Sequence, residues 1–271
     1  PWFGSKDGDW TSAGFVRGDF GISYQDKRPV GSVLWDAIGW TVLISSLSIL
    51  LTYLIAIPLG VRSAIRKGSF EDQSITTFLF ILYSLPSFWV ATLAIIYLCG
   101  GDYLDIFPPK FAPGADISSA AGGWEKFKDL AYHLALPLAC YTYGSFAYLS
   151  RQMRGGMLST LQADFIRTAR AKGLSGKKVI WKHALRNSLL PIITLFASVF
   201  PLAISGGIVL EIIFSIPGMG KVGYEAVIFR NYPVVFAIMM FSAILTLVGY
   251  LVADILYAVV DPRISYSSNK K

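Results

Sequence analysis

The stretch DFIRTARAKGLSGKKVIWKHALRNSLLP, residues 164–191, is a basic, soluble-looking segment in a chain that is otherwise largely apolar. The 271 residues are 54% hydrophobic and only 15% charged, whereas a soluble domain usually carries about 25% charged residues. The composition therefore indicates an integral membrane protein in which this stretch lies outside the lipid.

Five apolar segments flank the polar parts of the chain, and each is long enough to cross a bilayer, which takes about 20 residues. They are too long for strands and lack strict alternation of apolar and polar residues. We therefore predict an all-α integral membrane protein with five transmembrane helices. The segments are Ile38–Val61, Ser74–Gly101, Leu130–Ser150, Asn187–Leu210 and Tyr232–Ala253, with local kinks expected at Pro58, Pro86, Pro137, Pro191 and Pro201.

The positive charges are distributed unevenly between the two sides of the membrane. Segments 62–73, 151–186 and 254–271 hold fifteen Lys and Arg residues, and the segments on the other side hold nine. Cytoplasmic loops carry the excess of Lys and Arg. We therefore expect the C-terminus in the cytoplasm, and the net charge of +7 to reflect topology. No nucleic-acid recognition motif is present, so no nucleic-acid partner is expected.

This orientation predicts the domain boundaries. Residues 1–37 form an extracytoplasmic segment, residues 38–260 form the transmembrane domain with a cytoplasmic loop at 151–186, and residues 261–271 form a cytoplasmic tail. Because nothing before Ile38 could carry residues 1–37 across the membrane, we expect one more helix upstream, giving six in the full chain. A cleaved signal peptide is the alternative.

The opening stretch contains the start signal and the apolar spacing of a short amphipathic helix. Thr160 or Asp164 can cap its N-terminus. Leu161, Phe165 and Ala169 recur at intervals of four residues, which predicts one apolar stripe. Such a stripe either lies on the anionic inner leaflet of the membrane, with lipid as the partner, or inserts into the groove of a partner protein.

A glycine turn is predicted directly after this helix. Gly173 stands where a helix commonly ends in a left-handed residue, and Leu174 occupies the next position, which often packs back onto the helix. Ser175 can cap a second helix that leads into the span at Asn187.

The motif RTARAKGL…HALRNSLLP, at 167–174 and 183–191, resembles the cytoplasmic signature loop of ABC-importer permeases of the dipeptide/oligopeptide/nickel family. Gly173 and Ala169 match the glycine and the second alanine of that loop, and Arg167 stands where most importers have a glutamate. The resemblance extends to GDFGISYQDKRPV (18–30), IPLGVRSAIRKGSFED (57–72), SLPSFWV (84–90), EIIFSIPGMGKVGYEAV (211–227) and DILYAVVDPRI (254–264).

The resemblance implies a type I ABC importer permease fold in a bacterial or archaeal cytoplasmic membrane. Its partners would be a homologous second permease, two cytosolic ABC ATPases and an extracytoplasmic solute-binding protein. The chain would form the translocation path for peptides or a related small solute; importers of nickel chelates, glutathione and antimicrobial peptides share these motifs. The implied ATPase-coupling residues are Leu161, Asp164, Phe165, Arg167, Ala169, Arg170, Lys172, Gly173 and Leu174.

The remaining sequence indicates a transporter that relies on a partner for energy. It contains no phosphate-binding GxxxxGK[ST] loop, and the predicted spans contain no Asp, Glu, Lys or Arg, whereas ion-coupled transporters place ionisable groups in the membrane. An ion-coupled secondary transporter or channel is the alternative function.

No catalytic or metal-binding constellation is found in the sequence. There is no HExxH motif, and neither histidine has a ligand-spaced partner, so no enzyme activity, metal or cofactor is expected. Glu211, at the outer end of the fourth predicted span, is a candidate for the exit of the translocation path. Alternatively, it pairs with Lys221 or is solvated.

Overall fold

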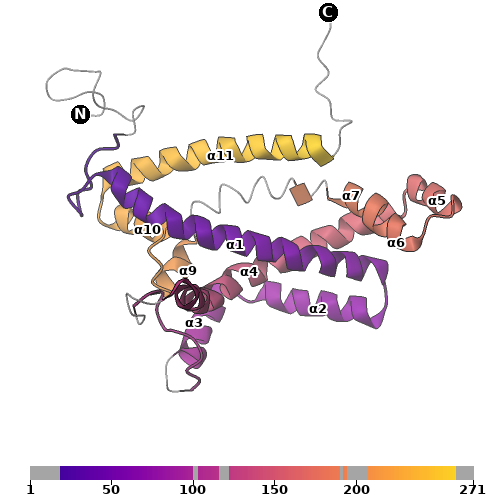
Figure 1. Ribbon diagram of the computed structural model, residues 1–271, viewed down its shortest axis with the longest axis horizontal. Helices are drawn as coiled ribbons and strands as arrows, with labels where there is room; N and C mark the ends of the chain where they lie inside the picture. The colour runs from indigo at the N-terminus through magenta and orange to yellow at the C-terminus, as the bar shows by residue number, and fades with distance from the viewer. Residues whose placement is uncertain (1–18, 100–102, 116–121, 190–191, 194–206, 261–271) are drawn as a thin grey trace, which may run out of the picture. The chain divides into compact units, whose positions relative to one another are not determined.

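The protein is predominantly helical in the part of the chain that the structure, a computed structural model, describes: residues 19–99, 103–115, 122–189, 192–193 and 207–260 (Figure 1). Within those residues the extended chain pairs only at two isolated bridges, so the predicted all-α fold is confirmed. The helices are α1 (Val30–Ile65), α2 (Phe70–Ser84), α3 (Ser87–Leu98), α4 (Gly123–Leu161), α5 (Asp164–Ala171), α6 (Gly176–Lys178), the π-helix η2 (Val179–Ala184), α7 (Leu185–Ser188), α9 (Ile208–Ile213), α10 (Met219–Ile228) and α11 (Tyr232–Val260).

Three of the predicted spans lie inside long helices. α1 contains the first, α4 the third and α11 the fifth. By length and composition, two helices of the described part can cross a membrane, α1 and residues Tyr232–Val252 of α11, or up to three if α2 and α3 count as one span. His133 and several tyrosines lower the mean hydropathy of the predicted span in α4. Most of the fourth predicted span, Asn187–Leu210, lies outside the described residues, so the total of five spans stays a prediction.

The second predicted span is not one continuous helix. α2 ends at Ser84, and α3 begins at Ser87. Leu85 between them is extended, with φ −87° and ψ 122°, because a proline at the next position disfavours the helical conformation of the residue before it. Pro86 therefore breaks the segment, and the expectation of a single helix over Ser74–Gly101 is wrong. Prolines 58 and 137 lie inside α1 and α4, which continue through them.

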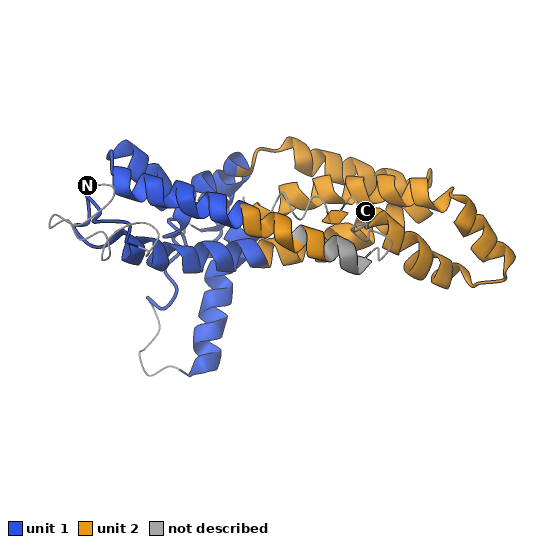
Figure 2. Cartoon of the chain, turned by 90° about the horizontal axis from the view of Figure 1, so that it is seen from above, with its two compact units in different colours: residues 1–46, 88–138, 201–246 blue, residues 47–87, 139–200, 247–271 orange. Residues whose placement is uncertain are grey.

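The chain forms two compact units, which Figure 2 shows in different colours. Unit 1 comprises residues 1–46, 88–138 and 201–246, and unit 2 comprises residues 47–87, 139–200 and 247–271. Each has its own buried apolar cluster. That of unit 1 is built from α1, α10 and α11: Val30, Leu34, Ala37, Met219, Ala226, Val234 and Ala237. That of unit 2 joins α1 and α4 to the segment after α4: Ala56, Val61, Ala64, Leu149, Met153, Met157, Ile166, Ala169, Val179, Ala184 and Ile192.

In unit 1, the side chain of Asn231 fastens the segment before α1 to the turn between α10 and α11. Its Oδ1 accepts a hydrogen bond from the Tyr24 N–H at 3.0 Å, and its Nδ2 donates one to the Ser23 hydroxyl at 2.8 Å. Asn231 and Ser23 are both buried, where a polar group without a hydrogen-bond partner would be costly. The segment before α1 is thus fixed, at residues 23 and 24, to the turn between α10 and α11.

In unit 2, a close approach of two backbones joins α1 to α4. A Cβ added at Gly60 would lie 2.6 Å from the Ser150 carbonyl oxygen and 2.7 Å from the Met153 Cβ. These neighbours are a backbone atom and the root of a fully buried side chain, so they cannot move aside cheaply. Glycine at position 60 therefore sets the distance between the two helices.

Replacing Gly60 by alanine is expected to lower the free energy of unfolding by about 1–3 kcal/mol, the usual range for overpacking. The matched control is Gly39→Ala in the same helix, where an added Cβ meets nothing within 4 Å. That change should be neutral or slightly stabilising, because alanine favours the helix. Unfolding in SDS, followed by circular dichroism, measures both, and equal values for the two variants would contradict the close packing at Gly60.

Candidate functional site

The basic segment after the third predicted span forms a chain of short helices in unit 2. α4 continues past Ser150 to Leu161, so residues 151–161 are a helical extension and not a loop. α5 follows, and then a turn, α6, η2 and α7 lead towards the fourth predicted span. The predicted order of a short helix, a turn and a second helical segment is therefore confirmed. We call residues 164–188 the coupling segment, after the role that the sequence resemblance implies for it.

The turn after α5 has the predicted geometry. Gly173 has a φ of +76°, a conformation that residues with a side chain rarely adopt. The Gly173 N–H donates to the Arg170 carbonyl oxygen at 2.9 Å, and the Leu174 N–H donates to that of Ala169 at 3.3 Å. These two bonds form a Schellman motif, which satisfies carbonyl groups at the end of the helix. The glycine fixes the point at which the chain leaves α5.

The predicted apolar stripe is only partly right. Ala169 is buried in the core of unit 2, and Leu161, at the end of α4, packs against that core. Phe165, however, is 45% exposed, and its neighbour Ile166 is 1% exposed. Adjacent residues point about 100° apart on a helix, so Phe165 lies at the edge of the face that Ile166 buries and is only half covered. The spacing of three between Ile166 and Ala169 was the available signal, and sequence reasoning missed it.

The expected side-chain caps of the coupling segment are absent from its described helices. The residue at the N-cap of α5 is Ala163, whose side chain has no atom that could accept a capping hydrogen bond, and Asp164 is the first helical residue. Ser175 is at the N-cap of α6 but makes no capping hydrogen bond through its side chain. Thr160 is engaged elsewhere, with its hydroxyl 3.0 Å from that of Ser188 in α7. Tertiary contacts, not local caps, thus determine where these helices lie.

The charged residues predicted for coupling are exposed on α5 and the turn that follows it. Asp164 lies 3.6 Å from Arg167, but both side chains are more than three-quarters exposed, and such an ion pair contributes little stability. The cationic side chains of α5 and its turn are all exposed, as is Leu174 at 37%: Arg167, Arg170 and Lys172. The structure thus brings the predicted coupling residues together, apart from Leu161 and Ala169, which face the core.

The far end of the coupling segment rests on α4. A Cβ added at Gly156 of α4 would lie 3.3 Å from the Ser188 carbonyl oxygen, so the two backbones are close. The buried Ser188 also meets Thr160, one turn further along α4. The coupling segment is therefore in direct contact with α4 at this end.

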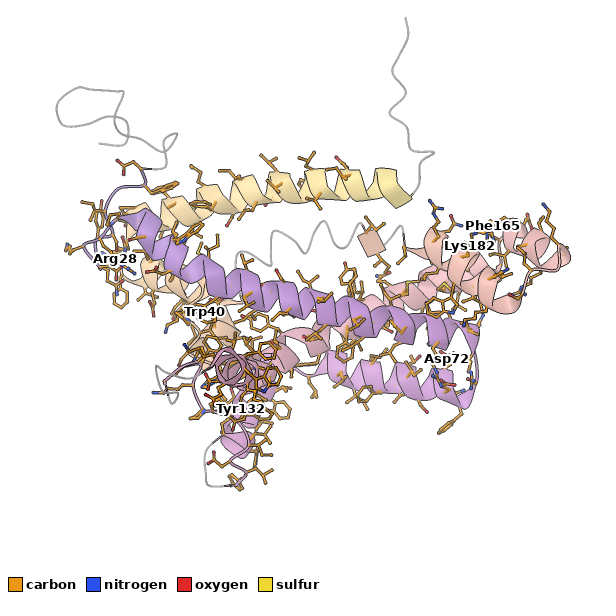
Figure 3. All side chains as sticks on the ribbon, viewed as in Figure 1. Arg28, Trp40, Asp72, Tyr132, Phe165 and Lys182 are labelled. Carbon is orange, nitrogen blue, oxygen red and sulfur yellow. The ribbon has the colours of Figure 1, made fainter. Side chains whose placement is uncertain are left out.

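A buried ion pair fastens α4 to α2 and to the turn between α1 and α2, and the sequence analysis did not identify it. The Asp72 carboxylate accepts hydrogen bonds from Arg154 Nε and Nη2 at 2.9 and 2.8 Å. It also accepts one from the Gly68 N–H at 2.9 Å and one from the Ser63 hydroxyl. Arg154 holds the pKa of the Asp72 carboxyl well below its usual range, so the pair is charged at neutral pH. One carboxylate thereby ties together α1, α2 and α4 (Figure 3).

Glu211, predicted to line the exit of the translocation path, is enclosed within unit 1. It is 2% exposed, and its carboxylate accepts hydrogen bonds from the Thr41 hydroxyl at 3.2 Å and from the Lys221 N–H at 2.8 Å. The Thr41 hydroxyl in turn accepts from the Met219 N–H at 2.7 Å. Glu211 therefore caps the N-terminus of α10. Its partner at position 221 is the backbone N–H, in place of the side-chain ammonium that the sequence suggested.

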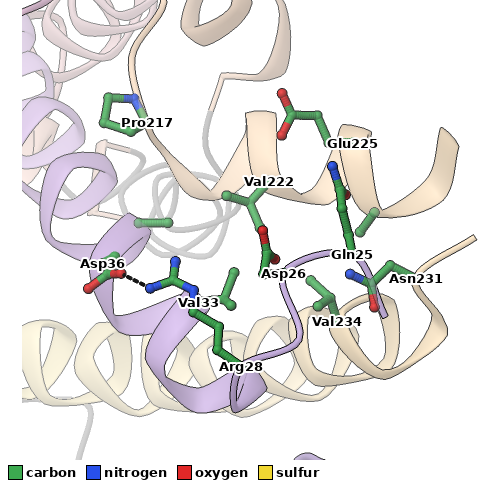
Figure 4. Close-up of a pocket in the computed structure, with 12 residues that line it drawn as sticks. Gln25, Asp26, Arg28, Val33, Asp36, Pro217, Val222, Glu225, Asn231 and Val234 are labelled. Atoms are coloured by element: carbon green, nitrogen blue, oxygen red, sulfur yellow. Dashed lines mark hydrogen bonds and ion pairs between the residues drawn. The ribbon is translucent and has the colours of Figure 1, made fainter. Parts of the chain in front are cut away.

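A small pocket of about 170 Å³ lies beside α10 in unit 1 (Figure 4). Apolar side chains, including Val33 and Val222, line part of it, and the polar lining includes three acidic residues: Asp26, Asp36 and Glu225. The one basic side chain, Arg28, is paired with Asp36 at 2.8 Å. In the part of the chain that the structure describes, no group of three or more His, Cys, Asp or Glu residues could hold a metal ion.

Comparison with known proteins shows the family to which this chain belongs. The family profile described as "Binding-protein-dependent transport system inner membrane component" matches residues 56–266. The oligopeptide transport system permease protein AppB of Bacillus subtilis (strain 168) is 41% identical over 258 residues, which cover 93% of this chain and 77% of AppB. The inner membrane ABC transporter permease protein YejB of Escherichia coli O157:H7 is 35% identical over 253 residues, covering 93% of this chain and 69% of YejB.

The fold has a counterpart among solved structures. A chain of the MetNI methionine ABC transporter in an inward-facing conformation superposes with a TM-score of 0.62 at 16% sequence identity, covering 84% of this chain and 96% of that one. The chain thus belongs to the binding-protein-dependent transport system inner membrane component family, as a multi-pass permease subunit of an ATP-binding-cassette importer.

Proposed function

We propose that α5 is the element through which this permease docks a cytosolic ATPase, and that the coupling segment passes the ATPase's movement to α4. The observation that carries this proposal is the combination of buried anchors and one exposed aromatic side chain on the same short helix. Ile166 and Ala169 anchor α5 in the core of unit 2, and Phe165, at the edge of the buried face, remains 45% exposed. A short helix fixed in this way can transmit a displacement instead of yielding to it.

The surroundings of Phe165 favour a protein partner over the membrane surface. A helix that binds lipid lays a broad apolar face into the headgroup region. The apolar residues Ile166 and Ala169 of α5 are already buried in the protein's own core, which leaves a single large apolar side chain outside. An exposed aromatic side chain on a short helix that also carries exposed cationic residues is a typical anchor at a protein interface.

The proposed assembly has one ATPase for each permease subunit. This chain would pair with a homologous second permease, each would dock one of two cytosolic ATPases, and an extracytoplasmic solute-binding protein would deliver the cargo. The family description supports dependence on a binding protein. Because the family is the permease component, ATP hydrolysis belongs to the partner subunit.

We further propose that the cargo is a peptide, because the name of AppB assigns oligopeptides to that relative. In liposomes that contain the reconstituted transporter and its binding protein, short peptides should stimulate ATP hydrolysis and accumulate inside. Nickel chelates and glutathione, tested at the same concentrations, should do neither. Stimulation by a nickel chelate without stimulation by peptides would overturn the substrate class while leaving the docking proposal intact.

The proposal requires the coupling segment and the C-terminus to lie in the cytoplasm. Lys110 and Lys177 are both exposed, and lie on opposite sides in the predicted topology. In a background that lacks Cys99 and Cys140, an impermeant maleimide added to intact cells should label Lys110→Cys and should label Lys177→Cys only after the membrane is opened. The reverse pattern would show that the positive-inside assignment fails for this chain.

A further inference from the structure

Two adjoining cavities of unit 2 lie between α2 and α4, away from the exposed face of α5. Their volumes are about 450 Å³ and 290 Å³, and the Arg151 side chain lines both. Hydroxyl-bearing residues line the larger cavity: Thr76 and Thr77 from α2 and Ser150 from α4. Tyr83 and Tyr148 line the smaller one. Together the cavities form a groove that is lined by both polar groups and aromatic rings.

The charge in this groove is positive and uncompensated. Arg154, which also lines the larger cavity, is bound to Asp72, so its charge is matched. Arg151 is exposed and makes no ion pair or side-chain hydrogen bond with any other residue that the structure describes. No Asp or Glu is among the described residues that line either cavity. A free guanidinium beside hydroxyl groups is suited to a phosphate group, which Arg can bind through two parallel hydrogen bonds.

The position of the groove along the chain indicates a membrane ligand. Arg151 directly follows the last residue of the predicted span Leu130–Ser150, which places it at the depth of the lipid headgroups. Tyr83 and Tyr148 are 53% and 43% exposed, and Phe80, which lines the larger cavity, is 59% exposed. Tyrosines are enriched at the boundary between lipid and water. The groove therefore offers both a cationic contact and an apolar surface, which match the two parts of a phospholipid.

We infer that the groove between α2 and α4 is a binding site for an anionic phospholipid, with Arg151 contacting the phosphate and Phe80, Tyr83 and Tyr148 contacting the apolar part. This inference rests on the proposed cytoplasmic position of residues 151–186, because anionic lipids give the cytoplasmic leaflet its negative charge. Bound lipid would cover the side of α4 that faces away from its contacts with the coupling segment at Gly156 and Thr160, and so would hold α2 against α4.

The test compares Arg151→Gln with Lys67→Gln in the purified, assembled transporter. Lys67 is an exposed cation of the same predicted cytoplasmic side and lines neither cavity. Native mass spectrometry measures phosphatidylglycerol binding, and thermal unfolding measures stabilisation by that lipid, by phosphatidylcholine and by inorganic phosphate. Arg151→Gln should weaken phosphatidylglycerol binding about fivefold, the effect expected for one cation at the membrane surface. Lys67→Gln should leave it unchanged.

Three outcomes would overturn the inference. Equal phosphatidylglycerol binding by the two variants would show that Arg151 is not a ligand. Stabilisation by inorganic phosphate equal to that by phosphatidylglycerol would assign the groove to free phosphate. Loss of the second permease from Arg151→Gln, with lipid binding intact, would identify the groove as a subunit interface. The measurement does not involve ATP, so a difference between the variants would persist even if α5 did not dock the ATPase.

Discussion

Replacing Asp72 by alanine is expected to lower the free energy of unfolding by roughly 2–4 kcal/mol, because it leaves Arg154, Ser63 and the Gly68 N–H without their shared acceptor. Asp72 is 3% exposed, so water cannot replace the carboxylate fully. The Arg154 side chain is 31% exposed, which keeps the effect below the largest seen for buried pairs. Unfolding of the purified protein in SDS, followed by circular dichroism, measures the change.

The neighbouring carboxylate provides the control. Glu71 pairs with Arg62 and Arg66, whose side chains are 64% and 61% exposed, and exposed ion pairs contribute about 0–1 kcal/mol. Glu71→Ala should therefore have a small effect.

The double variant Asp72→Ala, Arg154→Met tests whether the two residues act as a pair. It should lose less stability than the two single changes combined, since neither partner is left alone. Additive losses would mean that the two residues do not act as a pair.

Replacing Phe165 by aspartate is expected to abolish docking of the ATPase while leaving the fold intact. The side chain is 45% exposed, so an aspartate at this position can keep its carboxylate in water. Loss of an aromatic anchor typically costs an interface about 2 kcal/mol or more, which corresponds to roughly a thirtyfold loss of affinity. Co-purification of the ATPase with the permease, and substrate-stimulated hydrolysis in liposomes, should both fall by at least that factor.

The matched control for Phe165→Asp is Phe70→Asp. Phe70 is 85% exposed and lies in the predicted cytoplasmic segment 62–73, but outside the coupling segment. An acidic residue in the first turn of α2 is favoured by the helix dipole, so the protein should fold normally. If both variants lost the ATPase equally, general damage to the cytoplasmic surface would explain the result better than a specific contact at Phe165.

Gly173→Val should produce the same loss of coupling for a different reason. A β-branched residue at a φ of +76° costs on the order of 1–3 kcal/mol, so the turn would rearrange and α5 would be presented at another angle. Gly176→Val is the control, since Gly176 has no positive φ and an added Cβ there meets nothing within 4 Å. Wild-type coupling in Gly173→Val would contradict the requirement for this turn.

The parts of the structure that depend on local backbone chemistry could be predicted from the sequence. Gly173 was identified because a left-handed residue ends many helices, and this constraint involves only neighbouring residues. The effect of Pro86 is also local, although we expected a kink and the structure has a break. In both cases the cause lies within a few residues of its effect.

The parts that depend on packing between distant segments could not be predicted in the same way. Asp72 and Arg154 are 82 residues apart, and no pattern in the sequence around either residue indicates the other as its partner. Whether Phe165 or Ile166 faces inward depends on the core that α1 and α4 supply, because both residues are apolar and adjacent. Glu211 presents the same difficulty, since its hydrogen-bond partner Thr41 comes from another helix 170 residues away.

The most direct test of the proposed coupling role is a cross-linking experiment at two adjacent positions of α5. Phe165→Cys and Ile166→Cys are made in a background that lacks the native cysteines, and a short thiol-to-amine cross-linker is added to membranes that contain the whole transporter. Phe165 is 45% exposed and Ile166 is 1% exposed. Docking of the ATPase on α5 therefore predicts a cross-linked permease–ATPase product from Phe165→Cys and almost none from Ile166→Cys. Absence of the product at both positions, or equal yields at both, would contradict docking of the ATPase through the exposed face of α5.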